Sequence, residues 1–225
     1  MSSLPLVKIC CIRNLAEARM AIDYGAAAIG LVSAMPSGPG VIAEADIAEI
    51  AAAVPLPTRT FLLTSLTDPD AIAEQHARLA TTTLQLVDTV APNGLARLRE
   101  YLPAVELVQV IHVVDDSSVH EAIGVAPLVD AILLDSGRPR AAVKELGGTG
   151  RVHDWNLSRQ IRESVTIPVY LAGGLNPDLV AEAWVAVQPY GFDVCSGLRT
   201  DGVLDQSKLA AFMEQVGRLG LNVEY

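Results

Sequence analysis

The chain has 225 residues, of which 51% are hydrophobic, and a formal net charge of −10 at neutral pH. This length and apolar content suffice for one domain with a sizeable core. The negative charge argues against nucleic acid as a partner, because phosphate backbones are bound by clustered Lys and Arg. No apolar run reaches the roughly 18 to 20 residues of a membrane-spanning helix, and the first residues lack a signal-peptide pattern. We therefore expect a cytoplasmic protein with no membrane partner.

The three cysteines do not have the spacing of a disulfide framework or of a zinc site. Two of them, Cys10 and Cys11, are adjacent. The four histidines, at positions 76, 112, 120 and 153, also form no metal-ligand spacing. We therefore expect a reducing compartment and no metal site.

Short apolar runs alternate with amphipathic segments along the whole chain. The apolar runs predict strands at 7–12, 28–32, 59–64, 83–87, 106–113, 131–134, 168–171 and 192–194. The amphipathic segments predict helices at 15–24, 44–53, 70–79, 94–101, 117–125, 154–163, 177–187 and 204–219. The first helix has a typical start and stop, because Asn14 can cap it and Gly25 can end it.

Eight strands that alternate with eight helices, without a linker, predict one domain over residues 1–225. Continuous apolar strands that are covered by helices are typical of a parallel sheet. Eight of them in this length favour a closed α/β barrel, the (βα)8 TIM barrel. An open doubly wound sheet is the alternative, but it would need fewer units and a topological switch point.

Glycine-rich turns follow the seventh and eighth predicted strands. Gly173 and Gly174 come directly after one, and Ser196 and Gly197 come after the other. Glycine lets the backbone approach a ligand closely, and amides near a helix N-terminus attract an anion. In such barrels the loops after strands 7 and 8 commonly hold phosphate, so we expect a phosphate site here.

Two reactive side chains are predicted at the same end of the barrel. Lys8 and Cys10 have the same parity on the first strand and should point the same way, whereas Cys11 should face the opposite side. A thiolate near positive charge can serve as a base or a nucleophile, although buried Cys is more often a small hydrophobic residue. Asp135 ends an apolar strand, where a carboxylate can serve a site. The two phosphate turns lie between these strands around the ring, which suits a phosphorylated substrate that an acid and a base convert.

Two other polar residues have open roles. Asp193 precedes the Ser196–Gly197 turn, where it can contact a ligand or bond loop amides. His112 lies late in the fifth strand, and a structural role is the simpler interpretation.

These residues together resemble the phosphoribosylanthranilate isomerase family of tryptophan biosynthesis. The resemblance covers essentially the whole chain in order. It is carried by 8–10 (Lys-Ile-Cys), 133–135 (Leu-Leu-Asp), 147–150 (Gly-Gly-Thr-Gly), 154–155 (Asp-Trp), 171–177 (Leu-Ala-Gly-Gly-Leu-Asn-Pro) and 193–197 (Asp-Val-Cys-Ser-Gly).

The resemblance implies a single barrel that catalyses an Amadori rearrangement of a small phosphorylated sugar derivative without a cofactor. By resemblance, Asp135 is the general acid that opens the ribose ring, and Cys10 is the base that removes the C2′ proton. The phosphate is expected on the amides of Gly148, Gly173, Gly174, Ser196 and Gly197, and the further candidate substrate contacts are Lys8, Gln85 and Asp193. The oligomeric state is left open between monomer and homodimer.

Several positions depart from the family pattern. Cys11 replaces a glycine after the base, and Gly40 stands where an arginine usually holds the anthranilate carboxylate. Val87 replaces a histidine, and Arg199 replaces a glutamate. Losing a charge-assisted contact to a carboxylate costs about 1.5 to 3 kcal/mol, unless Arg13 or Arg199 replaces it.

Three interpretations follow. The first is a working isomerase with a rearranged aromatic pocket. The second is an isomerase for another phosphorylated sugar derivative without the carboxylate. The third is an idle paralogue that binds a phosphorylated metabolite or a protein, but it gives no reason for both Cys10 and Asp135.

Overall fold

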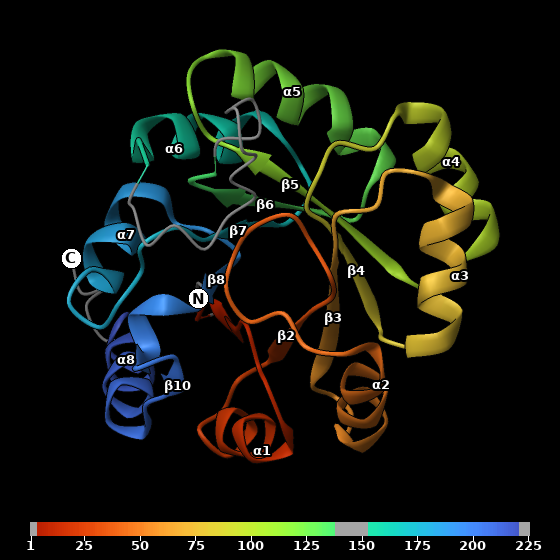
Figure 1. The fold of residues 1–225 in the computed structure, drawn as a ribbon. Helices are drawn as coiled ribbons and strands as arrows, with labels where there is room; N and C mark the ends of the chain where they lie inside the picture. Colours follow the sequence, from red (N-terminus) through yellow and green to blue (C-terminus); the bar gives the residue numbers. More distant parts are fainter. Residues whose placement is uncertain (1–3, 138–152, 221–225) are drawn as a thin grey trace.

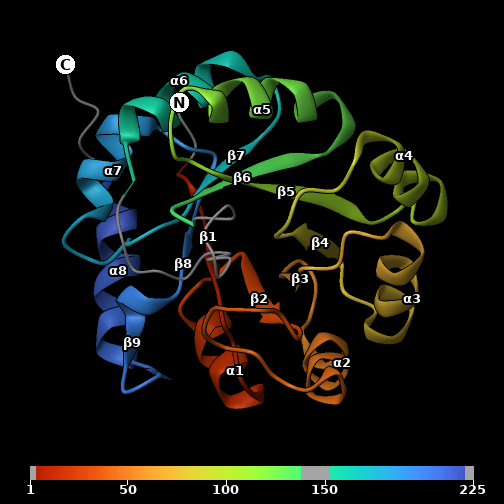
Figure 2. The ribbon, with the colours of Figure 1, turned by 45° about the horizontal axis from the view of Figure 1, so that its top comes forward.

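The computed structural model describes residues 4–137 and 153–220, and its parallel strands close into a barrel with the helices outside (Figures 1 and 2). The barrel order is β1 (Leu6–Ile9), β2 (Ala28–Val32), β3 (Arg59–Thr64), β4 (Thr83–Leu86), β5 (Glu106–His112), β6 (Ala131–Asp135), β7 (Val169–Leu171) and β8 (Gly191–Val194). Because β8 pairs with β1, the predicted barrel is confirmed and the open-sheet alternative is excluded.

The helices of the described residues cover the barrel from outside. They are α1 (Leu15–Asp23), α2 (Glu44–Ala53), α3 (Pro69–Leu79), α4 (Pro92–Tyr101), α5 (Ser117–Val125), α6 (Trp155–Ser164), α7 (Val180–Val187) and α8 (Gln206–Arg218). Several begin at a polar cap, as for Asn14, Asp68 and Asp205, whose side chains accept backbone N–H bonds of the first turn. Among the described helices, none is both long enough and apolar enough to cross a membrane.

The sequence prediction differs from the structure at two places that matter for the site. The first strand was expected to reach residue 12, but β1 ends at Ile9. The last helix was expected from residue 204, but residues 199–204 form a short hairpin of β9 (Arg199–Thr200) and β10 (Val203–Leu204). Figure 2 shows β9 beside α8. Such two-residue strands are too short for a pattern of period two to reveal them.

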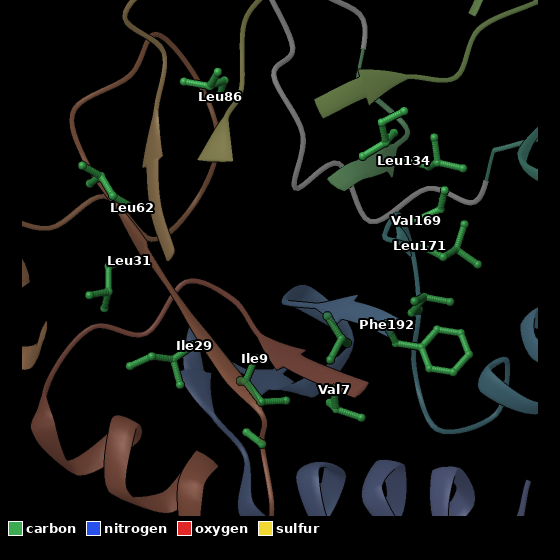
Figure 3. Packing of buried hydrophobic residues seen from close by; sticks show 14 of the residues in the cluster. Val7, Ile9, Ile29, Leu31, Leu62, Leu86, Leu134, Val169, Leu171 and Phe192 are labelled. Atoms are coloured by element: carbon green, nitrogen blue, oxygen red, sulfur yellow. The ribbon is translucent and has the colours of Figure 1, made fainter. Parts of the chain in front are cut away.

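Alternation along the strands separates two apolar clusters. One face of each strand packs against the helices, and Figure 3 shows ten labelled members of this cluster: Val7, Ile9, Ile29, Leu31, Leu62, Leu86, Leu134, Val169, Leu171 and Phe192. The other face fills the barrel interior, where Phe61 of β3 meets Tyr170 of β7 with ring centroids 6.0 Å apart. Lys8, Gln85, Asp135 and Asp193 have the same inward parity. The barrel interior therefore contains these polar residues beside the apolar ones.

Candidate active site

A cavity opens where the strands of the barrel end. Its walls come from the residues at or just after the C-terminal ends of the strands and from the loop between β2 and α2, which Figure 1 shows in front of the barrel. The lining residues are Cys10, Cys11, Val32, Met35, Gly38, Pro39, Leu63, Gln85, Val110, Asp135, Ala172, Gly173, Gly174, Leu175, Asp193, Val194, Cys195 and Ser196. This is the end at which TIM barrels carry their active sites.

Cys10 lies above a buried ion pair. The Nζ atom of Lys8 is 2.7 Å from Oδ1 of Asp193 and 3.4 Å from Sγ of Cys10. Lys8 is fully buried, and burial alone would lower its pKa. The charges and hydrogen bonds of Asp193 and Cys10 outweigh burial and raise the pKa of Lys8 above its usual value. Lys8 is therefore a permanent cation next to the Cys10 sulfur.

The pairing of β1 with β8 produces this arrangement. Lys8 lies opposite Asp193 in the register of the two strands, so the salt bridge joins direct neighbours. On the other side of β1, Gly30 leaves room for the thiol, because a Cβ built there would lie 2.7 Å from Sγ of Cys10. Lys8 itself is not among the residues that line the cavity; it lies beneath Cys10.

Asp135 reaches the cavity from the end of β6. Its Oδ1 accepts a hydrogen bond of 2.7 Å from the backbone N–H of Ser136. The charge of Asp135 acts on the imidazole of His153. Burial lowers the pKa of His153, while the charges of Asp135 and Asp154 oppose this. Nε2 of His153 lies 2.7 Å from Oγ of Ser158, and its buried Nδ1 has no partner among the described residues. Sequence reasoning gave His153 no role, because only the fold brings it near β6.

The turn after β7 has a backbone conformation that favours glycine. Gly173 and Gly174 have φ values of +83° and +68°, which side chains rarely adopt. Both line the cavity, as does Ser196 of the η2 turn (Ser196–Leu198) after β8. Gly197 lies just behind the wall, where an added Cβ would overlap the carbonyl oxygen of Leu175. Gly148 lies outside the described residues.

Gln85 lines the cavity and carries an unpaired acceptor. It comes from β4 and is 3% exposed, and its Oε1 has no hydrogen-bond partner among the described residues. A buried carbonyl oxygen without a partner is costly, so a ligand donor would satisfy it. His112, by contrast, bonds the carbonyl of Val87 at 3.1 Å from inside the barrel wall and does not line the cavity, consistent with the structural role expected for it.

The prediction for Cys11 was wrong. It was expected to face away from Cys10, but it lines the same cavity, and its Sγ lies 2.6 Å from Sγ of Cys195. The reason is local: β1 has ended at Ile9, and Cys11 has a φ of +62°, so the alternation of the strand no longer applies.

Neither arginine considered as a replacement cation lines the cavity. Nη1 of Arg13 bonds the carbonyl of Gly202, and both Nη atoms of Arg199 bond the carboxylate of Glu17 at 3.1 Å. Arg199 also bonds the carbonyls of Cys10 and Cys11, so it braces the backbone behind the proposed base. The described part of the lining contains no Lys or Arg.

The side of the cavity toward β2 and β3 is apolar. Val32, Met35, Pro39 and Leu63 form it, and a flat aromatic group would bury its faces against them. Within residues 4–137 and 153–220, no cluster of three or more His, Cys, Asp or Glu could hold a metal ion. The described lining of the cavity thus offers three thiols, two carboxylates, a glycine turn and an apolar wall.

Comparison with known proteins identifies relatives over nearly the whole chain. Residues 7–215 match the family model described as N-(5'phosphoribosyl)anthranilate (PRA) isomerase. An N-(5'-phosphoribosyl)anthranilate isomerase from Haloferax volcanii is 38% identical over 215 residues, covering 92% of this chain and 90% of that protein.

Solved structures support the same fold. A phosphoribosyl anthranilate isomerase in complex with reduced 1-(O-carboxyphenylamino)-1-deoxyribulose 5-phosphate has a TM-score of 0.79 at 23% identity, over 95% of this chain and 98% of the other. A structure of monomers made from the dimeric enzyme of Thermotoga maritima has a TM-score of 0.77 at 23% identity, with the same coverage.

Proposed function

The chain belongs to the N-(5'-phosphoribosyl)anthranilate isomerase family of tryptophan biosynthesis, and we propose that Cys10 and Asp135 carry out its rearrangement as base and acid. The observation that carries this assignment is the position of the Cys10 thiol 3.4 Å from the buried ammonium of Lys8, in the cavity that Asp135 also lines. An acid and a base on different walls can act on different atoms of one bound sugar.

The reaction converts an aldosylamine into an aminoketose, so its steps are proton transfers. Asp135 in its acid form protonates the ring oxygen of the ribose, and the C1′–O bond breaks to give a Schiff base. The Cys10 thiolate then removes the C2′ proton, which leaves an enolamine that becomes the ketone when C1′ gains a proton. Cys10 returns its proton to C1′ and the proton of the C2′ hydroxyl passes to Asp135, so the acid and the base end the cycle as they began it.

Lys8 and Asp193 are proposed to position Cys10 and to stabilise its thiolate. The ammonium of Lys8 would stabilise negative charge on Sγ, and the 2.7 Å bond to Asp193 fixes it in place. Both are positioning residues, although Asp193 also reaches the cavity wall. The unpaired Oε1 of Gln85 would accept a hydrogen bond from a substrate hydroxyl or amine.

The phosphate is proposed to bind the turns after β7 and β8. Gly173 and Gly174 allow the backbone to approach a ligand without a side chain in between, and Ser196 adds a hydroxyl. In the related complex, the bound compound is a 5-phosphate with a carboxyphenylamino group. The apolar wall of Val32, Met35 and Leu63 suits the phenyl ring of such a compound.

The decisive experiment is a fluorescence assay that follows freshly generated phosphoribosylanthranilate. We expect Cys10→Ser and Asp135→Asn each to lower kcat by about 10² to 10⁴-fold, the usual contribution of a general acid or base. Asp116→Asn is the matched control, because Asp116 is exposed and its side chain caps nothing. Full activity in either test variant, with the fold intact by circular dichroism, would refute the assigned roles.

A second experiment tests the interpretation that the site tolerates an aglycone without a carboxylate. The described lining has no cation for that group, so we expect an N-phenyl analogue without the carboxylate to bind within about tenfold of the natural substrate. If the analogue binds much more than tenfold more weakly, a charged contact to the carboxylate exists. The site would then not accept aglycones without a carboxylate. The expectation of a monomer or homodimer stays a prediction.

A further inference from the structure

Cys11 and Cys195 bring two thiols together at the mouth of the cavity, although they lie 184 residues apart in the sequence. Their Sγ atoms are 2.6 Å apart, well inside the van der Waals contact of two sulfur atoms. Cys11 is buried, whereas Cys195 is half-buried, and both line the cavity from which a small reagent would reach them. Neither thiol has a role in the proposed rearrangement.

The backbone holds this pair close. β1 and β8 are paired with Ile9 opposite Val194, and the two cysteines follow these residues at the strand ends. Arg199 bonds the carbonyl of Cys11 and so fixes the turn that carries it. The approach of the two thiols is therefore a consequence of the barrel closure.

The two thiols differ in acidity. The hydrogen bond with Cys11 lowers the pKa of the Cys195 thiol, and the guanidinium of Arg199 adds to this effect, while burial and Asp193 oppose it. Hydrogen bonds to Cys10 and Cys195, together with burial, raise the pKa of Cys11. Cys195 is thus the thiol that becomes a thiolate, and Cys11 is the neighbour that keeps its proton.

We propose that Cys11 and Cys195 form a reversible dithiol–disulfide pair across the mouth of the cavity, oxidised by low-molecular-weight disulfides. The Cys195 thiolate attacks one sulfur of the small disulfide, which forms a mixed disulfide and expels one small thiolate. Sγ of Cys11 then loses its proton and attacks Sγ of Cys195, which expels the second small thiol. The two cysteines lose two electrons, and the small disulfide gains both.

The bond would connect two parts of the active site. Cys10 directly precedes Cys11, and Ser196 directly follows Cys195. A disulfide would therefore tie the proposed base to the proposed phosphate turn and remove the Cys11 thiol proton from beside Cys10. We expect slower turnover in the oxidised form, and this part of the inference rests on the proposed function.

The first test uses oxidised glutathione on the full chain. After incubation, free thiols are blocked with iodoacetamide, and the digest is analysed by mass spectrometry. We expect a peptide pair linked through Cys11 and Cys195, with Cys10 alkylated, and complete reversal by dithiothreitol. The Cys10→Ser variant should form the same link. A link that involves Cys10, or glutathione that stays attached without an internal bond, would overturn the proposal.

Thermal unfolding gives a second readout that is independent of activity. Because the bond closes a long loop in the unfolded chain, the oxidised protein should melt at least several degrees higher than the reduced protein. Cys195→Ala treated in the same way should show no shift, and a shift in that variant would contradict the assignment.

Turnover of the same samples tests the consequence for activity. Oxidised wild type should turn over more slowly than reduced wild type, and dithiothreitol should restore the rate. Equal rates in the two forms would refute control of activity by the pair. A reduced protein without any turnover would instead count against the proposed function, while the linked peptide would still decide the disulfide.

Discussion

Gly40 leaves the space that the side chain of Cys11 occupies. A Cβ built on Gly40 would lie 2.5 Å from Cβ of Cys11 and 3.0 Å from its Cα. Both residues have positive φ, +82° for Gly40 and +62° for Cys11. The Cys11 side chain and a side chain at position 40 therefore compete for the same space, so the two positions are coupled by packing.

This relationship predicts that an arginine cannot be placed at position 40 while Cys11 is present. Gly40→Arg should destabilise the protein by about 3 kcal/mol, because a side chain at positive φ costs about 1 to 2 kcal/mol and the overlap with Cys11 adds to it. Cys11→Gly/Gly40→Arg should recover at least about 1 kcal/mol of this loss. Urea unfolding of both single variants and the double variant measures the coupling, and strictly additive changes would show that the two positions are independent.

The buried ion pair predicts a large stability effect at Lys8. Lys8→Met leaves the carboxylate of Asp193 buried without its partner, so we expect a loss of about 3 to 5 kcal/mol at pH 7. The double variant Lys8→Met/Asp193→Asn has no unpaired buried carboxylate and should therefore lose less stability than Lys8→Met.

The pH dependence gives a second check on this pair. Burial raises the pKa of Asp193 above its ordinary value, and Lys8 is the cation among the described residues that opposes this. The penalty of Lys8→Met should therefore grow as pH rises above about 3.8, the ordinary value, and shrink below it. A deficit that is constant with pH in urea unfolding would contradict this account.

The ion pair between Glu17 and Arg199 is expected to weaken in acid. Burial would raise the pKa of Glu17, but hydrogen bonds from Arg199 and Leu204 outweigh it and lower the pKa below 4.5. Its stabilisation is therefore complete above about pH 4.5 and is lost as pH falls through the lower folded value. Glu17→Gln should cost about 2 kcal/mol at pH 7 and much less near pH 3. Glu214→Gln, in an exposed pair with Arg218, is the control and should change stability little at either pH.

Gly197 predicts that the turn after β8 tolerates no side chain. In Gly197→Ala the new Cβ would overlap the Leu175 carbonyl, so the turn must move away from β7. If that turn binds phosphate, KM should rise by at least about tenfold, together with a loss of stability. Gly217→Ala in α8 is the matched control, because an added Cβ meets nothing within 4 Å there, and it should stabilise slightly. An unchanged KM in a folded Gly197→Ala protein would remove this turn from the phosphate site.

The sequence was informative where one local rule governs the outcome. Asp135 was singled out because it ends an apolar strand, and the structure places it at the end of β6 in the cavity lining. Parity likewise aligned Lys8 with Cys10. The glycines after β7 correctly marked a turn, because a Gly-Gly pair after an apolar run is a strong turn signal.

Elsewhere the local rule did not apply at the residue in question. Cys11 was assigned to the outer face because β1 was expected to continue, and the strand end at Ile9 could not be read from an apolar run that extends to Ile12. The hairpin of β9 and β10 was missed for a related reason, since two-residue strands carry no periodicity. Arg199 was considered for the substrate, but its partner Glu17 lies 182 residues away in the sequence.

The sequence by itself thus determined the barrel and its family and placed the proposed base and acid at strand ends on one side of the barrel, because these follow from local periodicity and short motifs. Only the tertiary structure decided which charges and thiols meet. The Lys8–Asp193 pair, the approach of Cys11 to Cys195 and the fit of Cys11 against Gly40 all join segments that are distant in the chain. Their distances are set by the closure of β8 onto β1 and by the packing of the loop after β2, which no local pattern encodes.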